Sequence, residues 1–137
     1  LIIRIQSKTN VMSYTNAKHI GNAHQEWLNE LDFFEKELSI LERRLAEVNS
    51  KNTSNESRAE VEHFQNQFIV QRNNIAEMKH SINENKHLVA QDALQHAGHV
   101  KVIRMDEYKK FEDDLADFEK ILYELRQEFN KYASKWM

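Results

Sequence analysis

The stretch that decides the fold runs from residue 106 to residue 136 and reads DEYKKFEDDLADFEKILYELRQEFNKYASKW. Its apolar residues are separated alternately by three and four positions, which places them in one stripe along an α-helix. They are Tyr108, Phe111, Leu115, Phe118, Leu122, Leu125, Phe129, Tyr132 and Trp136. The spacing predicts a helix over about residues 104–136 that buries this stripe against other helices.

Two earlier segments repeat the same period, with a few polar residues on the stripe. The first contains Ile20, His24, Trp27, Leu31, Phe34, Leu38, Leu41, Leu45 and Val48. The second contains Val61, Phe64, Phe68, Gln71, Ile75, Met78, Ile82, Asn85 and Val89. They predict helices over about residues 15–49 and 54–97, and buried Gln71 and Asn85 are expected to fix the register of packing.

The chain reverses between the first two helices, where residues 49–53 (NSKNT) interrupt the apolar period. Side chains of this kind compete for backbone hydrogen bonds and favour turns. Thr53 and Glu56 have the spacing of a capping box, which predicts Thr53 as the cap of the second helix. The second connection, residues 98–104, is compatible with an extended link or with the first turn of the third helix.

Short reversals force neighbouring helices to run antiparallel. The sequence therefore predicts an all-α fold: a long antiparallel three-helix bundle, up-down-up, with coiled-coil-like packing. We expect a single domain over residues 13–137, preceded by an extended or disordered N-terminal segment over residues 1–12.

Composition narrows the classes of function. The net charge is −3 and the basic residues do not form a stripe, so we expect no nucleic-acid partner. There is no cysteine, and two glycines with no proline leave no room for a phosphate-binding loop, so we expect no enzymatic activity. No apolar run approaches the roughly 20 residues of a membrane span, and we expect a cytoplasmic protein without a membrane partner.

Seven histidines keep metal binding open as an alternative function. Folding the first helix back on the second brings His24 near His80 and Glu84, with Asp117 of the third helix at a compatible height. Imidazole and carboxylate ligands of this kind could bind zinc or iron. The competing interpretation makes His24 a core imidazole that is hydrogen-bonded to Asn85 or to a neighbour. No cofactor is expected in that case.

Apolar residues outside the stripes give the strongest functional indication. Phe33 and Ile40 lie seven residues apart on the flank of the first helix, and Ile69 and Val70 lie on the flank of the second. Exposed apolar patches mark partner surfaces. We therefore expect a non-enzymatic interaction or structural module, which associates with itself as a homodimer or binds another protein through these four residues.

Overall fold

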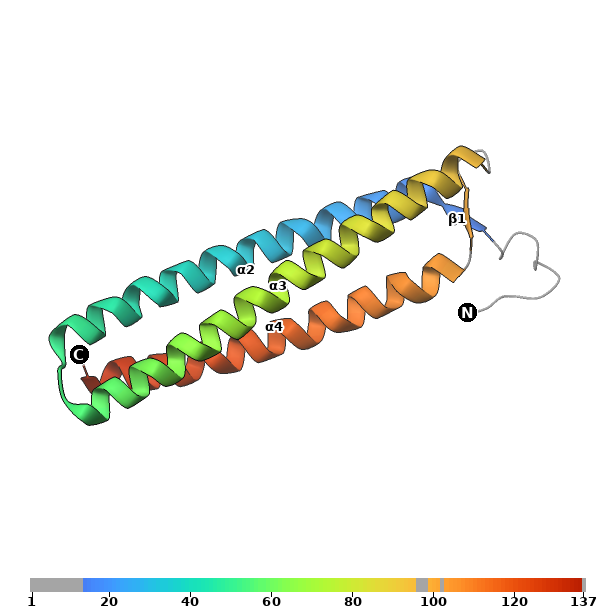
Figure 1. Cartoon of the computed structure of the whole chain (residues 1–137). Helices are drawn as coiled ribbons and strands as arrows, with labels where there is room; N and C mark the ends of the chain where they lie inside the picture. Colours follow the sequence, from blue (N-terminus) through green and yellow to red (C-terminus); the bar gives the residue numbers. More distant parts are fainter. Residues whose placement is uncertain (1–13, 96–98, 102, 137) are drawn as a thin grey trace. The chain divides into compact units, whose positions relative to one another are not determined.

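The computed structural model describes residues 14–95, 99–101 and 103–136. Within them, the fold is an all-α, antiparallel bundle of three helices: α2 (Ala17–Lys51), α3 (Asn55–Gln95) and α4 (Ile103–Trp136) (Figure 1). Two short strands, β1 (Tyr14–Asn16) and β2 (His99–Lys101), precede α2 and α4. The predicted three-helix fold is confirmed.

The helix boundaries fall close to the predicted ones. The observed helices cover residues 17–51, 55–95 and 103–136, against predictions of 15–49, 54–97 and 104–136. The predicted N-terminal segment, residues 1–12, lies outside the described residues, as do residues 96–98.

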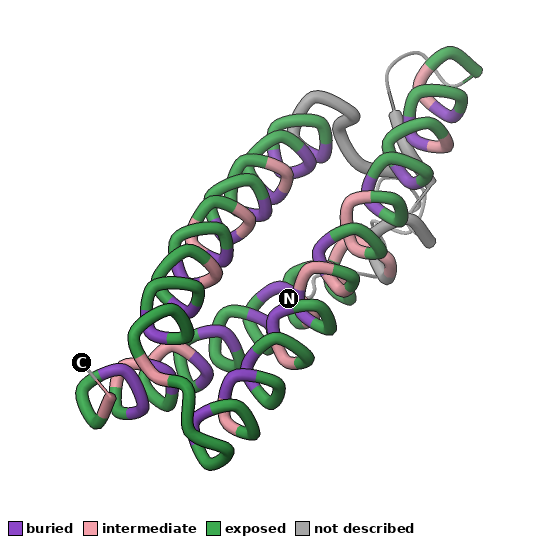
Figure 2. Tube along the Cα trace, turned by 60° about the vertical axis from the view of Figure 1, so that its left-hand side comes forward, coloured by how far each residue is buried: buried purple, intermediate pink, exposed green. Residues whose placement is uncertain are grey.

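The three- and four-residue steps produce a buried stripe on every helix, and these stripes are drawn in purple in Figure 2. Leu31 of α2, Phe68 of α3 and Leu122 of α4 are 0%, 1% and 2% exposed. Gln71 and Asn85 are buried as well, so their expected positions on the seam are confirmed. Burial of large side chains at about 1.5–3 kcal/mol each is the main term that stabilises the helices.

The cap of α3 differs from the prediction. The backbone N–H of Ser57 donates to Oγ of Ser54 at 3.1 Å, and α3 begins at Asn55. Ser54 is therefore the cap, and Thr53 lies one residue before it. Glu56, the predicted partner of Thr53, accepts a hydrogen bond from Lys135 at 3.1 Å instead. The prediction was wrong because two adjacent hydroxyl residues can each cap a helix, and the sequence does not show which one does.

The bundle divides into two compact units, and the division falls within all three helices. Unit 1 comprises the chain up to Asn29 together with Met78–Leu115, and unit 2 comprises Glu30–Glu77 and Ala116–Met137. Each unit contains a segment of α2, of α3 and of α4. The prediction of a single domain is not tested by this division.

In unit 1, β1 pairs with β2 in antiparallel register, with Thr15 opposite Val100. The extended link that the sequence left open over residues 98–104 is therefore present at His99–Lys101. The core contains Ile20 and Val89, and Tyr108 packs against them. The segment before α2 thus pairs with the connection between α3 and α4 in one small sheet.

The core of unit 2 is rich in aromatic rings. The ring centroids of Phe64 and Phe129 lie 5.4 Å apart, nearly perpendicular, and those of Phe68 and Phe129 lie 5.7 Å apart. At the turn, Asn52 Nδ2 donates to the backbone carbonyls of Val48 and Trp136, both at 2.9 Å. These bonds join the end of α2 to the end of α4.

Candidate functional site

Exposed apolar side chains are concentrated in unit 2. Of the seven large apolar side chains that stand exposed in the described part of the chain, only Leu94 belongs to unit 1. The other six are Phe33, Ile40, Ile69, Val70, Ile121 and Tyr123. The expectation that Phe33, Ile40, Ile69 and Val70 are exposed is confirmed. Helix surfaces of this kind are candidates for contact with another protein.

Phe33 and Ile40 belong to one line of side chains on α2, which we call the α2 stripe: Glu30, Phe33, Glu37, Ile40 and Arg44. Its members are separated by three or four residues, so they lie on one side of the helix. Two contacts fix the direction of that side. Glu37 accepts a hydrogen bond from Arg126, and Arg44 Nη1 donates to Asn130 Oδ1 at 2.9 Å. The α2 stripe therefore flanks the junction with α4.

Helix α4 adds an aromatic ring to this junction. Arg126 Nη1 lies 3.2 Å from Glu37 Oε1, and the same guanidinium carbon lies 5.6 Å from the centroid of the Tyr123 ring. Tyr123 is 53% exposed. The charge of Glu37, in the middle of the α2 stripe, is thus compensated by Arg126 of the same chain. Apolar Phe33, Ile40 and Tyr123 surround this neutralised pair.

Ile69 and Val70 do not join the α2 stripe. Ile69 lines a groove between α2 and α3, together with Ala46, Asn49 and Gln65. Val70 is the next residue along α3, and consecutive residues of a helix point about 100° apart. The four residues predicted as one interface therefore divide into the α2 stripe, which holds Phe33 and Ile40, and separate positions on α3.

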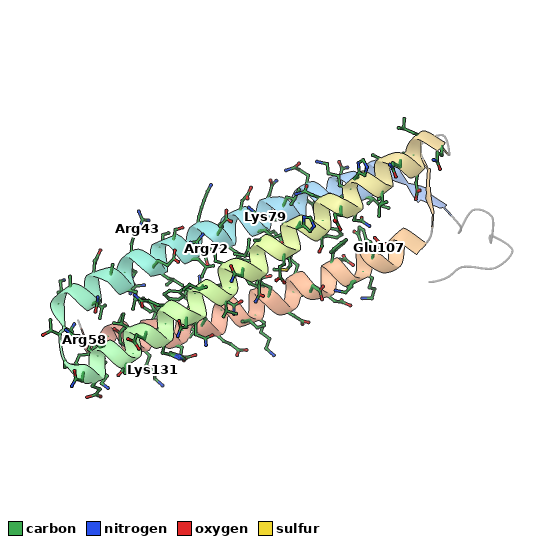
Figure 3. All side chains as sticks on the ribbon, in the orientation of Figure 1. Arg43, Arg58, Arg72, Lys79, Glu107 and Lys131 are labelled. Carbon is green, nitrogen blue, oxygen red and sulfur yellow. The ribbon has the colours of Figure 1, made fainter. Side chains whose placement is uncertain are left out.

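A shallow hollow adjoins Ile40 on the outer side of α2, with basic residues at its edge. Lys36, Ser39, Glu42, Arg43 and Ala46 line it with Ile40. Figure 3 shows Arg43 projecting outward from α2. The hollow next to the α2 stripe therefore carries two basic residues and one acidic residue.

A second candidate feature is a chain of hydrogen-bonded polar residues in unit 1, two of which are buried. His24 is 1% exposed, and its Nε2 lies 2.7 Å from Oδ1 of Asn85, which is 2% exposed. Asn85 Nδ2 donates in turn to the carboxylate of Glu107. Residues of α2, α3 and α4 are thus linked in sequence. The interpretation of His24 as a core imidazole bonded to Asn85 is confirmed.

The surroundings of His24 disfavour its charged form. Burial lowers the pKa of His24 from 6.5, the hydrogen bond to Asn85 opposes this change, and the positive charge of Lys86 adds to it. The edge of the imidazole faces Trp27, with ring centroids 5.8 Å apart. Burial and Lys86 therefore favour the neutral form of His24.

The predicted metal ligands differ in burial and in the unit to which they belong. His80 and Glu84 form an exposed pair on α3, with Nε2 and Oε1 3.0 Å apart. His24 of the same unit points into the core and uses Nε2 for Asn85. Asp117 is exposed and belongs to unit 2. Among the described residues, no three histidines and carboxylates are grouped so that they could hold a metal ion. Metal binding stays an untested prediction.

Two features of these sites were not found from the sequence. The apolar period does not single out Glu107, which ends the polar chain that begins at His24. It does not single out Tyr123 either, which lies outside the stripe of α4. The signal for Tyr123 was present, since Tyr123 and Arg126 lie three residues apart on α4 and a cation commonly stacks on a neighbouring ring.

Comparison of the chain with protein-family models, with curated proteins and with solved structures finds no match. Within the described residues, none of the helices combines the length and the apolar character that crossing a bilayer requires.

Proposed function

We propose that this chain is a non-enzymatic helical interaction module that associates with a second copy of itself through the α2 stripe. The observation that carries the proposal is the exposure of Phe33 and Ile40, at 56% and 48%, on one side of α2. Covering two large apolar side chains in each copy removes apolar surface from water, at about 25 cal/mol for each Å².

The order of residues on the stripe supports a second copy as the partner. It runs acidic, apolar, acidic, apolar, basic: Glu30, Phe33, Glu37, Ile40, Arg44. When two such helices pack antiparallel, Phe33 of each copy meets Ile40 of the other, and Glu30 approaches Arg44. A two-fold symmetric interface uses the same patch twice, so it requires this kind of self-complementarity.

The middle of the stripe is compatible with such a contact as well. Glu37 of both copies would lie near the two-fold axis, where two bare carboxylates would repel each other. Arg126 lies 3.2 Å from Glu37 in each copy and compensates its charge. Tyr123, beneath the same guanidinium, widens the apolar area on either side.

Sedimentation equilibrium of the full chain tests the proposal. The wild type is expected to show a reversible monomer–dimer equilibrium. The double variant Phe33→Glu/Ile40→Glu places two charges in each half of the interface and is expected to raise the dissociation constant at least tenfold. Circular dichroism should be unchanged, because both side chains are exposed in the single chain.

The matched control is Ile69→Glu/Val70→Glu, which adds the same charges to equally exposed positions of α3. This variant is expected to dimerise like the wild type. A wild type that stays monomeric at every concentration would contradict self-association. Equal weakening by both double variants would contradict the assignment to the α2 stripe.

A further inference from the structure

We propose that the polar chain His24–Asn85–Glu107, in which His24 and Asn85 are buried, is a pH-sensitive clasp, which holds unit 1 closed at neutral pH and releases it in mild acid while unit 2 stays folded. The inference does not depend on the proposed self-association. It rests on the direction of the hydrogen bonds in the chain, on the burial of His24, and on the position of all three residues in unit 1.

The direction of each hydrogen bond follows from its carboxylate end. An ionised carboxylate only accepts, so Glu107 requires the amide nitrogen of Asn85. The amide oxygen of Asn85 then faces His24 and also only accepts, at 2.7 Å from Nε2. His24 must therefore carry its proton on Nε2. Its Nδ1 is left as a buried, unprotonated nitrogen, and no described side chain bonds to it.

Protonation of His24 conflicts with this arrangement. A second proton on Nδ1 would create a buried N–H without an acceptor, which is unfavourable because the lost contact with water is not replaced. The charged and titratable groups around His24 do little to stabilise a positive charge on its imidazole. Lys86 of α3 opposes a positive charge, and Glu107 of α4 is already bonded to Asn85. Tyr108 packs on Trp27 and is neutral in this pH range, because burial and the nearby Glu112 and Glu26 raise its pKa.

The direction of the pH effect follows from the linkage between proton binding by His24 and unfolding. Since the folded pKa of His24 lies below its unfolded value of 6.5, the unfolded chain binds more protons between the two values. The contribution of neutral His24 to the stability of the closed state is therefore complete above about pH 6.5, and it is lost as the pH falls below this value. The equilibrium constant for opening rises by up to about tenfold for each pKa unit by which the unfolded pKa of His24 exceeds the folded one.

The opening is expected to be confined to unit 1. Proteins can open locally, so that the contacts within one compact unit break while another part of the chain stays folded. Ile20 and Val89 belong to unit 1 with His24, whereas the rings of Phe64, Phe68 and Phe129 belong to unit 2. Among described side chains, unit 2 has no buried histidine, because its His63 is exposed.

The two tryptophans of the chain allow each unit to be observed separately. Trp27 lies in unit 1, where its ring is 4.9 Å from Tyr108, and Trp136 lies in unit 2. The variant Trp136→Phe reports on unit 1 alone, and Trp27→Phe reports on unit 2 alone. The readout is the wavelength of maximum emission, because a charged imidazole can quench a nearby indole without any opening.

Emission of the Trp136→Phe chain is expected to shift to longer wavelength between about pH 6.5 and pH 5, while that of the Trp27→Phe chain stays constant. Hydrogen exchange, corrected for the intrinsic effect of pH, should show at least tenfold loss of protection in residues 20–29 and 79–92 and no change in unit 2.

Three variants complete the test in the Trp136→Phe chain. His24→Gln keeps a neutral donor towards Asn85 and should abolish the shift, whereas His80→Gln, at an exposed position of the same unit, should leave it intact. If His24→Gln does not fold, His24→Leu/Asn85→Leu restores apolar residues to the seams and should also lack the shift. Persistence of the shift in either His24 variant, or equal opening of both units, would overturn the clasp.

Discussion

Two polar side chains, His24 and Asn85, occupy seam positions that apolar residues fill at most other points of the helices. Each satisfies part of the hydrogen-bonding capacity of the other, and the pair links α2 to α3. Buried polar pairs of this kind stabilise little in net terms, but breaking one is costly because the remaining group is buried without a partner. Their value lies in fixing which residues face each other.

This view predicts non-additive effects of substitution. Asn85→Leu leaves the buried Nε2–H of His24 without its acceptor and is expected to lower the free energy of unfolding by about 1–3 kcal/mol at neutral pH. His24→Leu should cost a similar amount. The double variant should recover most of the loss, since both polar groups are then gone.

Urea denaturation of the three variants, followed by circular dichroism, measures these values. A double variant as unstable as the sum of the single ones would show that the two residues act independently. The wild-type pair would then have no special role in α2–α3 packing.

Part of this residue-level account was predictable from the sequence. The period placed His24 and Asn85 on the seams, and folding α2 back on α3 brought them to the same height. The tautomer of His24 was not predictable, because it depends on Glu107, 83 residues further along the chain. The metal hypothesis relied on the number and approximate height of the histidines and did not account for the core position of His24.

At the scale of single elements, the start of α3 gives a direct test of capping. Ser54→Ala removes the acceptor of the Ser57 N–H and is expected to lower the free energy of unfolding by about 1 kcal/mol. Thr53→Ala, one residue earlier, should have less than half of that effect. Thermal melts of the two variants distinguish them, and a larger loss from Thr53→Ala would restore the capping box as the correct assignment.

The α2 stripe makes a prediction about charge. Glu30→Arg and Arg44→Glu each place like charges opposite one another in an antiparallel dimer and are expected to raise its dissociation constant about three- to tenfold. The combined variant restores opposite charges and should return to near the wild-type value. The two positions lie 14 residues apart on one helix, about 21 Å, so they cannot pair within a chain.

Sedimentation equilibrium at low salt measures these constants, because screening weakens exposed pairs. Recovery in the combined variant identifies the antiparallel arrangement. Additive weakening without recovery would exclude it, even if Phe33 and Ile40 were still required for association.

The division of the whole molecule into two units was not evident from the sequence. The apolar period continues without interruption across residues 29–30, 77–78 and 115–116, at which the division between the units falls in the sequence. The small sheet was also missed. Its strands are three residues each, and residues Tyr14 and Lys101 pair across most of the chain, so no local pattern predicts them. The three helices themselves were predictable because their period is local and repeated.

A core substitution should affect the two units unequally. Phe129→Ala removes a fully buried ring that contacts Phe64 and Phe68, and it is expected to lower the free energy of unfolding of unit 2 by about 3–5 kcal/mol. Denaturation followed by Trp136 in the Trp27→Phe chain should show this loss. A larger effect on the Trp27 signal in the Trp136→Phe chain would contradict the division of the core.

The most direct test of the central claim is the amide spectrum of the isotope-labelled wild-type chain, recorded by nuclear magnetic resonance over a dilution series. The account predicts that concentration-dependent shifts gather at residues 30–44 of α2 and around Tyr123 of α4. Shifts centred on another surface, or a spectrum that does not change with concentration, would contradict self-association through the α2 stripe.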